Sequence, residues 1–530
     1  MDSREPKPLQ ASLRKRFYEA VVFLYCLRNT FHKSRSTDPV ELDIAIERNS
    51  GETFKCFVNK VGQICDSTRG NGGGTITSCM ILQPGSVEYR LASNNRSEDE
   101  WIVVEEYLNG VLNILGEASD ETIRAANTQS DTFRTILRRV VIFTRPRMEW
   151  YTKEIAKNLE YCIEEADAEA TSNDEARTAA RDLRSLTPLV EFVAQQVVVA
   201  EESFATKTEA LLHVINGSYR HSLEGFIRAK ASGNRGGPAD TPWSTMHHAI
   251  GRLLSLFLGV KVLIYARRFW PEAFVDFRVT HVASSIPDDE PPSIRKTAGG
   301  MLKRMSAEPA VVRAYQARAD SLREWKLDDQ IKRRCSSRRF CPIVHAEILN
   351  HNSVVREDRE NAMAGEDPVR FFREAEFGRY IGCSKPTCRL CEQYFSAYPD
   401  IQVRPSHQNF YDNWRLPDVY PGEEQLEQKR DAILEQMVKT TRTEVFTALT
   451  KGRAVRNQFD SNDTPTNPLL TTDRSSSVIA TAGFDDVVSR MSSMSMAASR
   501  RPPVESSRES TPRSEGDLTL WEESDGGAAI

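Results

Sequence analysis

Long apolar runs are scarce in the sequence, and we expect none that crosses a membrane. Its best stretch, Phe17–Phe31, contains Glu19 and Arg28 and is shorter than the about 20 apolar residues that a spanning helix needs. The opening residues, MDSREPKPLQ, mix charges and have no apolar core of a signal peptide. We therefore expect an intracellular protein, in the cytoplasm or the nucleus, with no membrane partner.

A strong net charge and an internal repeat of fixed period are also lacking. The net charge is −5 over 530 residues, which by itself indicates neither a nucleic-acid nor a membrane partner. Charged residues make up 27% and apolar residues 39%, which suits a globular protein with some disordered length. A chain of this length exceeds one ordinary hydrophobic core, so two or three domains are expected.

The ten cysteines are unevenly spread. Five are scattered over the first half of the chain, and five crowd into residues 335–391. In a reducing compartment, clustered cysteines are better explained as metal ligands than as disulfides. Cys335 and Cys341 have no partner at a ligand spacing, so we expect ordinary core or surface thiols there. The crowded five are Cys335, Cys341, Cys383, Cys388 and Cys391.

Residues 1–283 predict a mainly helical N-terminal region, whose role the sequence does not reveal. Apolar residues recur there at helical spacing, and two strands interrupt the pattern. The loop RGNGGGT before those strands lacks the Lys-Ser/Thr pair of a phosphate-binding loop. The predicted helices span 132–168, 183–214 and 242–266, and the predicted strands span 75–82 and 86–93.

The second half predicts a linker, an α/β domain, a helix and a tail. The linker contains the string SSIPDDEPP. The tail is rich in Ser, Thr, Pro and Gly and poor in large apolar residues, so it buries too little surface to offset its chain entropy and is predicted to be disordered. The predicted bounds are 284–295 for the linker, 296–422 for the domain, 423–456 for the C-terminal helix and 457–530 for the tail. Inside the domain we expect a helix over 310–327 and strands over 340–344, 379–383 and 401–404.

Two short strings carry the chemistry. The first, CPIVHAE, is a predicted strand running into His345-Ala-Glu347. The second, GCSKPTCRLC, is a strand running into Cys388 and Cys391 and then a helix. Together they offer one imidazole and two thiolates to a metal, and one nearby carboxylate that need not be a ligand.

This set suits hydrolytic zinc chemistry. Three protein ligands leave the fourth tetrahedral position of zinc open for water, whose pKa the metal lowers toward neutrality. A carboxylate beside it accepts the water proton and returns it to a ring nitrogen and the leaving amine. We therefore predict one Zn²⁺ per chain, held by His345, Cys388 and Cys391, with Glu347 as the acid and base.

The local structure expected around these residues supports that prediction. Cys388 and Cys391 would lie in the first turn of a helix, where free N–H groups favour thiolate over thiol. Pro386, just ahead of them, suits a helix start. His345 and Glu347 are two residues apart and would not share one face of a regular helix, but at a strand-to-helix junction both can border one pocket.

The H-x-E and P-x-C-x-x-C arrangement resembles that of the zinc-dependent nucleotide and nucleic-acid deaminases. The wider strings CPIVHAEI, YIGCSKPTCRLC and NWRLPD resemble the OTT-type deaminase-like family, a largely fungal group. In the usual form Pro directly precedes the first Cys, whereas Thr387 intervenes here. The resemblance covers about residues 335–420 and implies a three-layer α/β/α, cytidine deaminase-like domain around a mixed sheet, with the zinc and acid–base roles given above.

Two alternatives to a deaminase remain open. The same fold could serve as a catalytically inactive, zinc-stabilised interaction module. A structural zinc site on an unrelated fold would need a fourth ligand, which Cys383 could supply; otherwise Cys383 is expected to be a buried core residue. We read His351, six residues after His345, as a surface residue.

Two further groups of residues could contact a nucleobase-containing substrate, and possibly a nucleic acid. A basic run before the catalytic strand could contact phosphates, or form a solvated loop or a nuclear-import patch. An aromatic and polar segment after it could stack on and hydrogen-bond a base, or pack in the core. The sequence does not distinguish cytosine from adenine, or a free nucleotide from a polymer. The basic residues are Lys332, Arg333, Arg334, Arg338 and Arg339, and the substrate-binding candidates are His407, Asn409, Trp414 and Arg415.

Overall fold

The computed structural model describes most of the chain up to residue 452, as a mainly helical protein with a five-stranded mixed sheet. The tail predicted at 457–530 lies outside the described residues, as do Arg338, Arg339 and part of the predicted linker. The described residues are 5–30, 50–68, 73–83, 85–194, 200–217, 223–232, 241–288, 293–322, 326–336 and 340–452.

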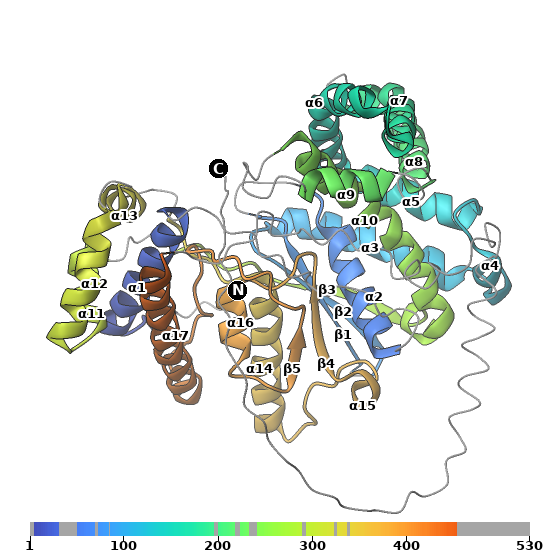
Figure 1. Ribbon diagram of the computed structural model, residues 1–530. Coiled ribbons are helices and arrows are strands. Elements are labelled where there is room, and N and C mark those ends of the chain that lie inside the picture. The colour runs from blue at the N-terminus through green and yellow to red at the C-terminus, as the bar shows by residue number, and fades with distance from the viewer. Residues whose placement is uncertain are drawn as a thin grey trace, which may run out of the picture.

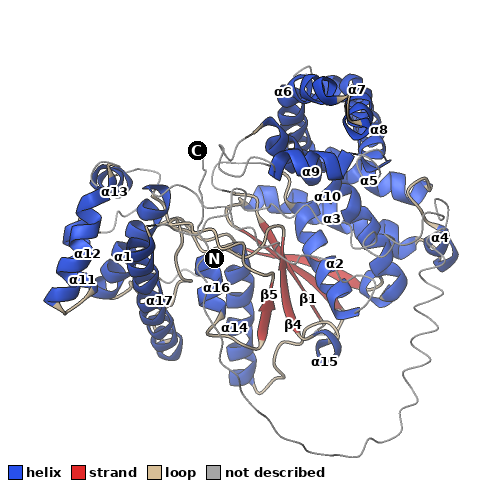
Figure 2. Cartoon of the chain, viewed as in Figure 1, coloured by secondary structure: helices blue, strands red, loops and turns tan. Residues whose placement is uncertain are grey.

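The sheet has the strand order β3-β2-β1-β4-β5. Figure 2 shows its strands in red, next to the helices in blue. β1 pairs antiparallel with both β2 and β4, whereas β2 with β3 and β4 with β5 are parallel pairs. The strands are β1 (Thr77–Leu82), β2 (Val87–Ser93), β3 (Phe277–Val282), β4 (Arg379–Cys383) and β5 (Ile401–Val403).

The sheet combines strands from both sides of the predicted linker. β1, β2 and β3 come from the region 1–283, and β4 and β5 come from the region 296–422. Whether those two regions fold independently stays a prediction. The sheet itself is shared between them. Hydrogen bonding between strands depends on proximity in space, which a composition-based boundary does not detect.

Helices cover both faces of this sheet. Along β1, Cys79 and Ile81 belong to one hydrophobic core, and Met80 and Leu82 belong to the other, as the alternation of side chains in a strand requires. On the first face lies α2 (Ser50–Cys65), and on the second lie α14 (Ala346–Ala364) and α16 (Arg389–Phe395). The helix α2 approaches closely because Gly62 has no side chain: a Cβ there would lie 2.7 Å from the Thr77 carbonyl oxygen.

A large group of helices lies between β2 and β3 in the sequence and forms the right side of the molecule in Figure 1. Serines cap several of its helices, and Ser97 forms a complete capping box with Glu100. The group consists of α3 (Glu98–Glu117), α4 (Asp120–Ala125), α5 (Asp131–Phe143), α6 (Arg145–Glu169), α7 (Asp174–Ala194), α8 (Glu201–Val214), α9 (Glu224–Ser232), α10 (Pro242–Phe269) and the 3₁₀ turn η2 (Pro271–Phe274).

The helix α10 is the centre of that group. Our expectation that Phe17–Phe31 is the best apolar stretch and that none is long enough to cross a membrane was wrong: among the described residues α10 is the one helix that is long and apolar enough by length and composition, and 94% of its most apolar window is buried. It packs against α2, α5, α6 and α9, so neighbouring helices cover its apolar surface. The intracellular location expected from the sequence stays a prediction.

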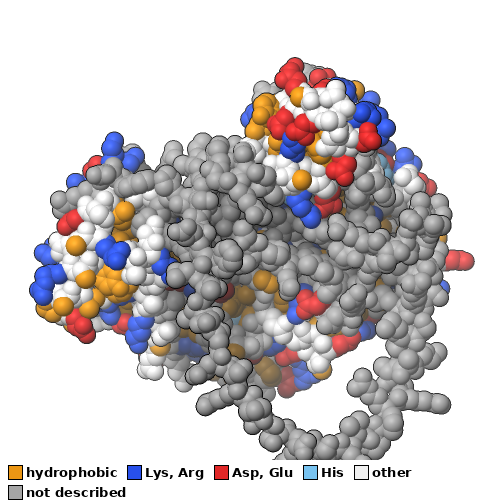
Figure 3. Space-filling model, viewed as in Figure 1, with side chains coloured by type: hydrophobic (Ala, Val, Ile, Leu, Met, Phe, Trp, Pro, Cys, Tyr) orange, Lys and Arg blue, Asp and Glu red, His pale blue; other side chains and the backbone are white. Residues whose placement is uncertain are grey.

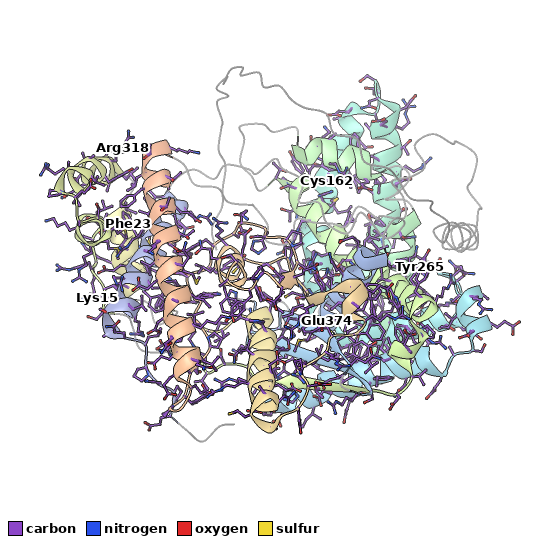
Figure 4. All side chains as sticks on the ribbon, turned by 90° about the horizontal axis from the view of Figure 1, so that it is seen from below. Lys15, Phe23, Cys162, Tyr265, Arg318 and Glu374 are labelled. Carbon is purple, nitrogen blue, oxygen red and sulfur yellow. The ribbon has the colours of Figure 1, made fainter. Side chains whose placement is uncertain are left out.

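A second helical group stands on the other side of the sheet, at the left of Figure 1. Here α1, from the start of the chain, packs along α17, more than 400 residues later. Arg318 lies beside the end of α17 (Figure 4), where its guanidinium donates a hydrogen bond to the Thr450 carbonyl oxygen at 3.3 Å. The group consists of α1 (Ala11–Thr30), α11 (Ala298–Met305), α12 (Pro309–Ser321), α13 (Leu327–Cys335) and α17 (Glu424–Lys451); α15 (Glu374–Phe377) lies at the sheet.

The predicted strands at 75–82, 86–93, 379–383 and 401–404 are confirmed as β1, β2, β4 and β5. The strand predicted at 340–344 is wrong, because that segment makes one isolated bridge, between Ile343 and Trp414. The helix predicted over 132–168 is two helices, since Arg145 and Pro146 start a new one. The span 183–214 likewise divides between α7 and α8, and 310–327 between α12 and α13, whereas α10 and α17 confirm the helices expected at 242–266 and 423–456. The strand β3 was not predicted.

Candidate metal centre

His345 lies where the chain passes from extended backbone into α14. It is the N-cap residue of that helix (φ −73°, ψ 153°), and its carbonyl oxygen accepts hydrogen bonds from the N–H groups of Ile348 and Leu349. The Ala346 N–H donates to Asn94 Oδ1 at 2.9 Å, which ties this junction to the end of β2. Glu347 falls in the first turn of the helix. The junction therefore directs both His345 and Glu347 into the interior.

Cys388 and Cys391 occupy the start of α16, as predicted. Cys388 is the N-cap residue (φ −79°, ψ 164°), and its Sγ accepts a hydrogen bond from the Cys391 N–H at 3.5 Å. The additional residue Thr387 is buried and forms a parallel bridge with Ser406. The helix start thus presents both sulfur atoms on one side despite the inserted threonine.

The three predicted ligands meet in the interior. His345 Nδ1 lies 3.5 Å from Cys388 Sγ and 3.3 Å from Cys391 Sγ. All three side chains are buried, and their ligand atoms lie within 4.8 Å of one another. Among the described residues no other group of His, Cys, Asp or Glu meets that criterion, and Cys383 is not a member. One imidazole and two thiols at these separations fit a tetrahedral zinc ion with one position left open.

The surroundings of Cys388 and Cys391 shift the pKa values of their thiols in opposite directions. Burial raises the pKa of Cys388, but the hydrogen bond from Cys391 and the charge of His345 outweigh it and bring that pKa well below its ordinary value. Burial and the neighbouring Cys388 raise the pKa of Cys391 well above its ordinary value. Burial lowers the pKa of His345, yet the negative charge of Cys388 raises it overall. Cys388 is therefore the more acidic of the two thiols.

Glu347 is buried next to these ligands. Burial raises the pKa of its carboxyl, and His345 and a hydrogen bond with Cys391 partly oppose that rise. Glu347 does not belong to the three-residue group whose ligand atoms converge. A carboxyl group with a raised pKa beside a metal centre is suited to proton transfer near neutral pH.

His351 is not a surface residue, contrary to our interpretation of the sequence. It lies one helical turn after Glu347, is 2% exposed, and its Nδ1 is 2.8 Å from the Tyr394 hydroxyl. Burial lowers its pKa to about 3, so the ring is neutral near pH 7. The 3.6-residue repeat of α14 explains the error, because it turns residue 351 inward with residue 347.

The substrate-binding candidates lie in a buried loop beside the metal centre. Trp414 is completely buried, and its Nε1–H donates a hydrogen bond to Cys391 Sγ at 3.3 Å. His407 Nδ1 accepts from the Asn409 N–H at 3.0 Å, and Arg415 donates to Asp418 Oδ1 at 2.7 Å. The side chains of His407 and Arg415 therefore bond to nearby residues of the same segment, and Trp414 bonds to α16. Base binding by these residues stays a prediction.

The basic run is only partly exposed. Arg334 forms a bidentate ion pair with the buried Asp412 and also donates to Asn413 Oδ1 at 2.8 Å. Lys332 and Arg333 are exposed on α13, at the end of the molecule where basic side chains are visible at the left of Figure 3. Of the described part of the run, these two residues are the ones available for phosphates.

Two buried asparagines near the centre were not predicted. Asn94 holds the start of α14, and Asn350 donates to Ser78 Oγ at 2.8 Å, which ties the same helix to β1. The sequence signal for Asn94 was its place directly after a buried strand, where polar side chains often border a site.

A pocket of about 430 Å³ lies elsewhere, between α11, α12 and α13, where Lys303 and Asp320 are among its lining residues. It does not include any of the residues of the metal centre. The candidate centre is therefore identified by its converging ligand atoms and their burial, which would suit a metal ion, rather than by cavity size.

One comparison with known proteins matches this part of the chain. Residues 344–418 match the model of the OTT_1508-like deaminase family, a stretch that contains His345, Glu347, Cys388 and Cys391. No curated protein and no solved structure matches the chain significantly. The match spans the strand-to-helix junction, both cysteines and the loop with Trp414, so the part of the chain that builds the metal centre is a domain of the OTT_1508-like deaminase family.

Proposed function

We propose that this protein is a zinc-dependent hydrolytic deaminase that acts on the C–N bond of a nucleobase, in a nucleoside, nucleotide or nucleic acid. The observation that carries the proposal is the convergence of His345, Cys388 and Cys391 on one buried point, with Glu347 beside it and Cys383 outside the group. Three ligands favour a catalytic site, whereas a structural zinc site requires four. The sheet with helices on both faces agrees with a cytidine deaminase-like α/β/α fold.

Each residue has a definite task in this mechanism. His345 Nδ1 and the sulfur atoms of Cys388 and Cys391 would hold the zinc. Zinc, when bound, lowers the pKa of a water molecule and so supplies the nucleophile. Glu347 would accept one proton of that water and deliver it to the ring nitrogen. It would then carry the second proton, from the added hydroxyl group, to the amine, which departs as ammonia when the C–N bond breaks and the carbonyl forms. The buried surroundings exclude bulk water and strengthen these electrostatic interactions.

The experiment is to incubate the purified chain with a panel of bases, nucleosides, nucleotides and single-stranded oligonucleotides, and to measure released ammonia. We expect release from at least one cytosine- or adenine-containing compound, and none from the Glu347→Gln variant. Cytosine and adenine compounds are tested separately because the residues of the centre do not distinguish them.

One observation favours a second function, a non-catalytic zinc-stabilised interaction module. Glu347 is only 5% exposed, and the pocket of about 430 Å³ lies away from it. In that case the protein would hold zinc and lose stability without it, but the whole panel would release no ammonia. Zinc content and ammonia release together separate the two functions.

A further inference from the structure

The segment Asp412–Arg415 contacts the chain just before His345. The Ile343 N–H donates to the Asn413 carbonyl oxygen at 3.4 Å, and the Arg415 N–H donates to the Ile343 carbonyl oxygen at 2.9 Å. The Cys341 N–H donates to Asn413 Oδ1 at 3.1 Å. These bonds fix the backbone two residues ahead of His345, and so the direction from which its ring enters the centre.

The same segment contacts the other half of the centre through one side chain. The indole Nε1–H of Trp414 donates to Cys391 Sγ at 3.3 Å. Within the same group, Cys391 Sγ is 3.3 Å from His345 Nδ1. Trp414 therefore bonds directly to the sulfur atom of one predicted ligand, Cys391. Its segment also holds the backbone that leads to another predicted ligand, His345.

The indole cannot easily turn away from the sulfur. Its ring is completely buried, and the ring of Phe17 lies 5.8 Å from it, centroid to centroid. The Tyr18 hydroxyl donates to the Trp414 carbonyl oxygen at 3.4 Å. The ion pair of Arg334 with Asp412 holds the segment from α13. Residues of α1 and α13 thus fix the orientation of the N–H group.

We propose that Trp414 is a positioning residue of the metal centre, whose indole N–H holds Cys391 Sγ in the ligating position. The inference rests on the proposed function, because it concerns the same zinc. Hydrogen-bond partners of metal ligands orient the ligand and tune its basicity, and their loss typically costs about 10- to 100-fold in metal affinity. Trp414 also links α1 to the centre, because the Phe17 ring contacts its indole and the Tyr18 hydroxyl bonds to its carbonyl oxygen.

The test replaces Trp414 by Phe in the full chain, which keeps an aromatic ring and removes the N–H donor. The matched control is Trp101→Phe: Trp101 is also completely buried, lies in the other hydrophobic core, and its Nε1 has no hydrogen-bond partner among the described residues. Zinc affinity is measured by competition with a chelator. The cobalt-substituted protein reports the sulfur–metal bonds through its thiolate-to-cobalt charge-transfer band.

We expect Trp414→Phe to bind zinc about 10- to 100-fold more weakly and to shift the charge-transfer band, with Trp101→Phe unchanged in both. If wild-type protein binds no zinc, the proposed function fails. If wild-type protein binds zinc and Trp414→Phe matches it in affinity and spectrum, the function stands and this inference is overturned. Should Trp414→Phe not fold, Phe17→Leu decides the question: a shifted band supports the inference, and an unchanged band overturns it.

Discussion

Asn94 at the end of β2 accepts a hydrogen bond from the Ala346 N–H, 252 residues further along the chain, and this contact joins the first half of the sequence to the His345 junction. It is one of several such links, since β1 also pairs with β4 and Asn350 bonds to Ser78. The site residues therefore come from the second half of the chain, and residues of the first half hold their elements in place.

A fragment of residues 293–452 should therefore not fold by itself. It contains the four site residues but lacks β1, β2 and β3, which form the larger part of the sheet. We expect no cooperative thermal unfolding and no stoichiometric zinc from the fragment, against a cooperative transition for the full chain. A fragment that unfolds cooperatively and holds zinc would show that the predicted boundary at 284–295 separates independent domains.

How far the sequence predicts this protein depends on how local each signal is. The candidate ligands were predictable because H-x-E and C-x-x-C each place metal-binding or proton-transferring side chains within a few residues of one another. The strand β3 and its pairing were not predictable, because β3 joins β2 across the entire helical group between them in the sequence. The role of Trp414 depends on a contact with Cys391, 23 residues earlier, that no spacing rule gives. The strand predicted at 340–344 failed because a short apolar run does not supply a partner strand, and Pro342 within it has no N–H to donate.

The contact of α2 with β1 should be sensitive to a single methyl group. Gly62→Ala should lower the free energy of unfolding by about 1–3 kcal/mol, because its Cβ would lie 2.7 Å from the Thr77 carbonyl oxygen and would force the helix from the sheet. The control is Gly225→Ala in α9, where a Cβ meets nothing within 4 Å. This substitution should raise the free energy of unfolding by no more than about 1 kcal/mol. Chemical denaturation measures both. Equal effects would contradict close packing at Gly62.

The buried ion pair of Arg147 with Asp66, at 2.5 Å, should be essential for stability. Arg147→Met leaves a carboxylate buried without its partner and should cost about 3–5 kcal/mol in denaturant unfolding at pH 7. Arg177→Met, which removes an exposed pair with Asp174, should leave stability nearly unchanged. A small loss in Arg147→Met would indicate that water or another cation replaces the guanidinium.

The same pair predicts a pH dependence. Burial raises the pKa of Asp66, but the charge and hydrogen bond of Arg147 outweigh it and hold that pKa below its ordinary value. A lowered folded-state pKa contributes stability above the ordinary pKa of about 4, and that contribution is lost as the pH falls further. The stability difference between wild type and Arg147→Met should therefore shrink as the pH falls from about 7 to about 3. A difference independent of pH would contradict the pairing.

The metal centre itself predicts a contrast between its cysteines. Cys388→Ser and Cys391→Ser should each lose most of the zinc, because their sulfur atoms converge on His345 Nδ1. Cys383→Ser should retain it, since Cys383 is outside the converging group. Zinc per chain is measured by atomic spectrometry after dialysis. Loss of zinc in Cys383→Ser would favour a four-ligand structural site.

The most direct test of the account is the rate of ammonia release by Glu347→Gln, compared with wild type at equal zinc content. Glu347 is placed beside the ligands without being one of them, so the glutamine variant should keep its zinc and its fold. An amide cannot accept the water proton, so the rate should fall by about 100- to 10,000-fold, toward the upper end because the group serves both proton transfers. Turnover at the wild-type rate, or loss of zinc from this variant, would contradict the proposed roles of Glu347 and its three neighbours.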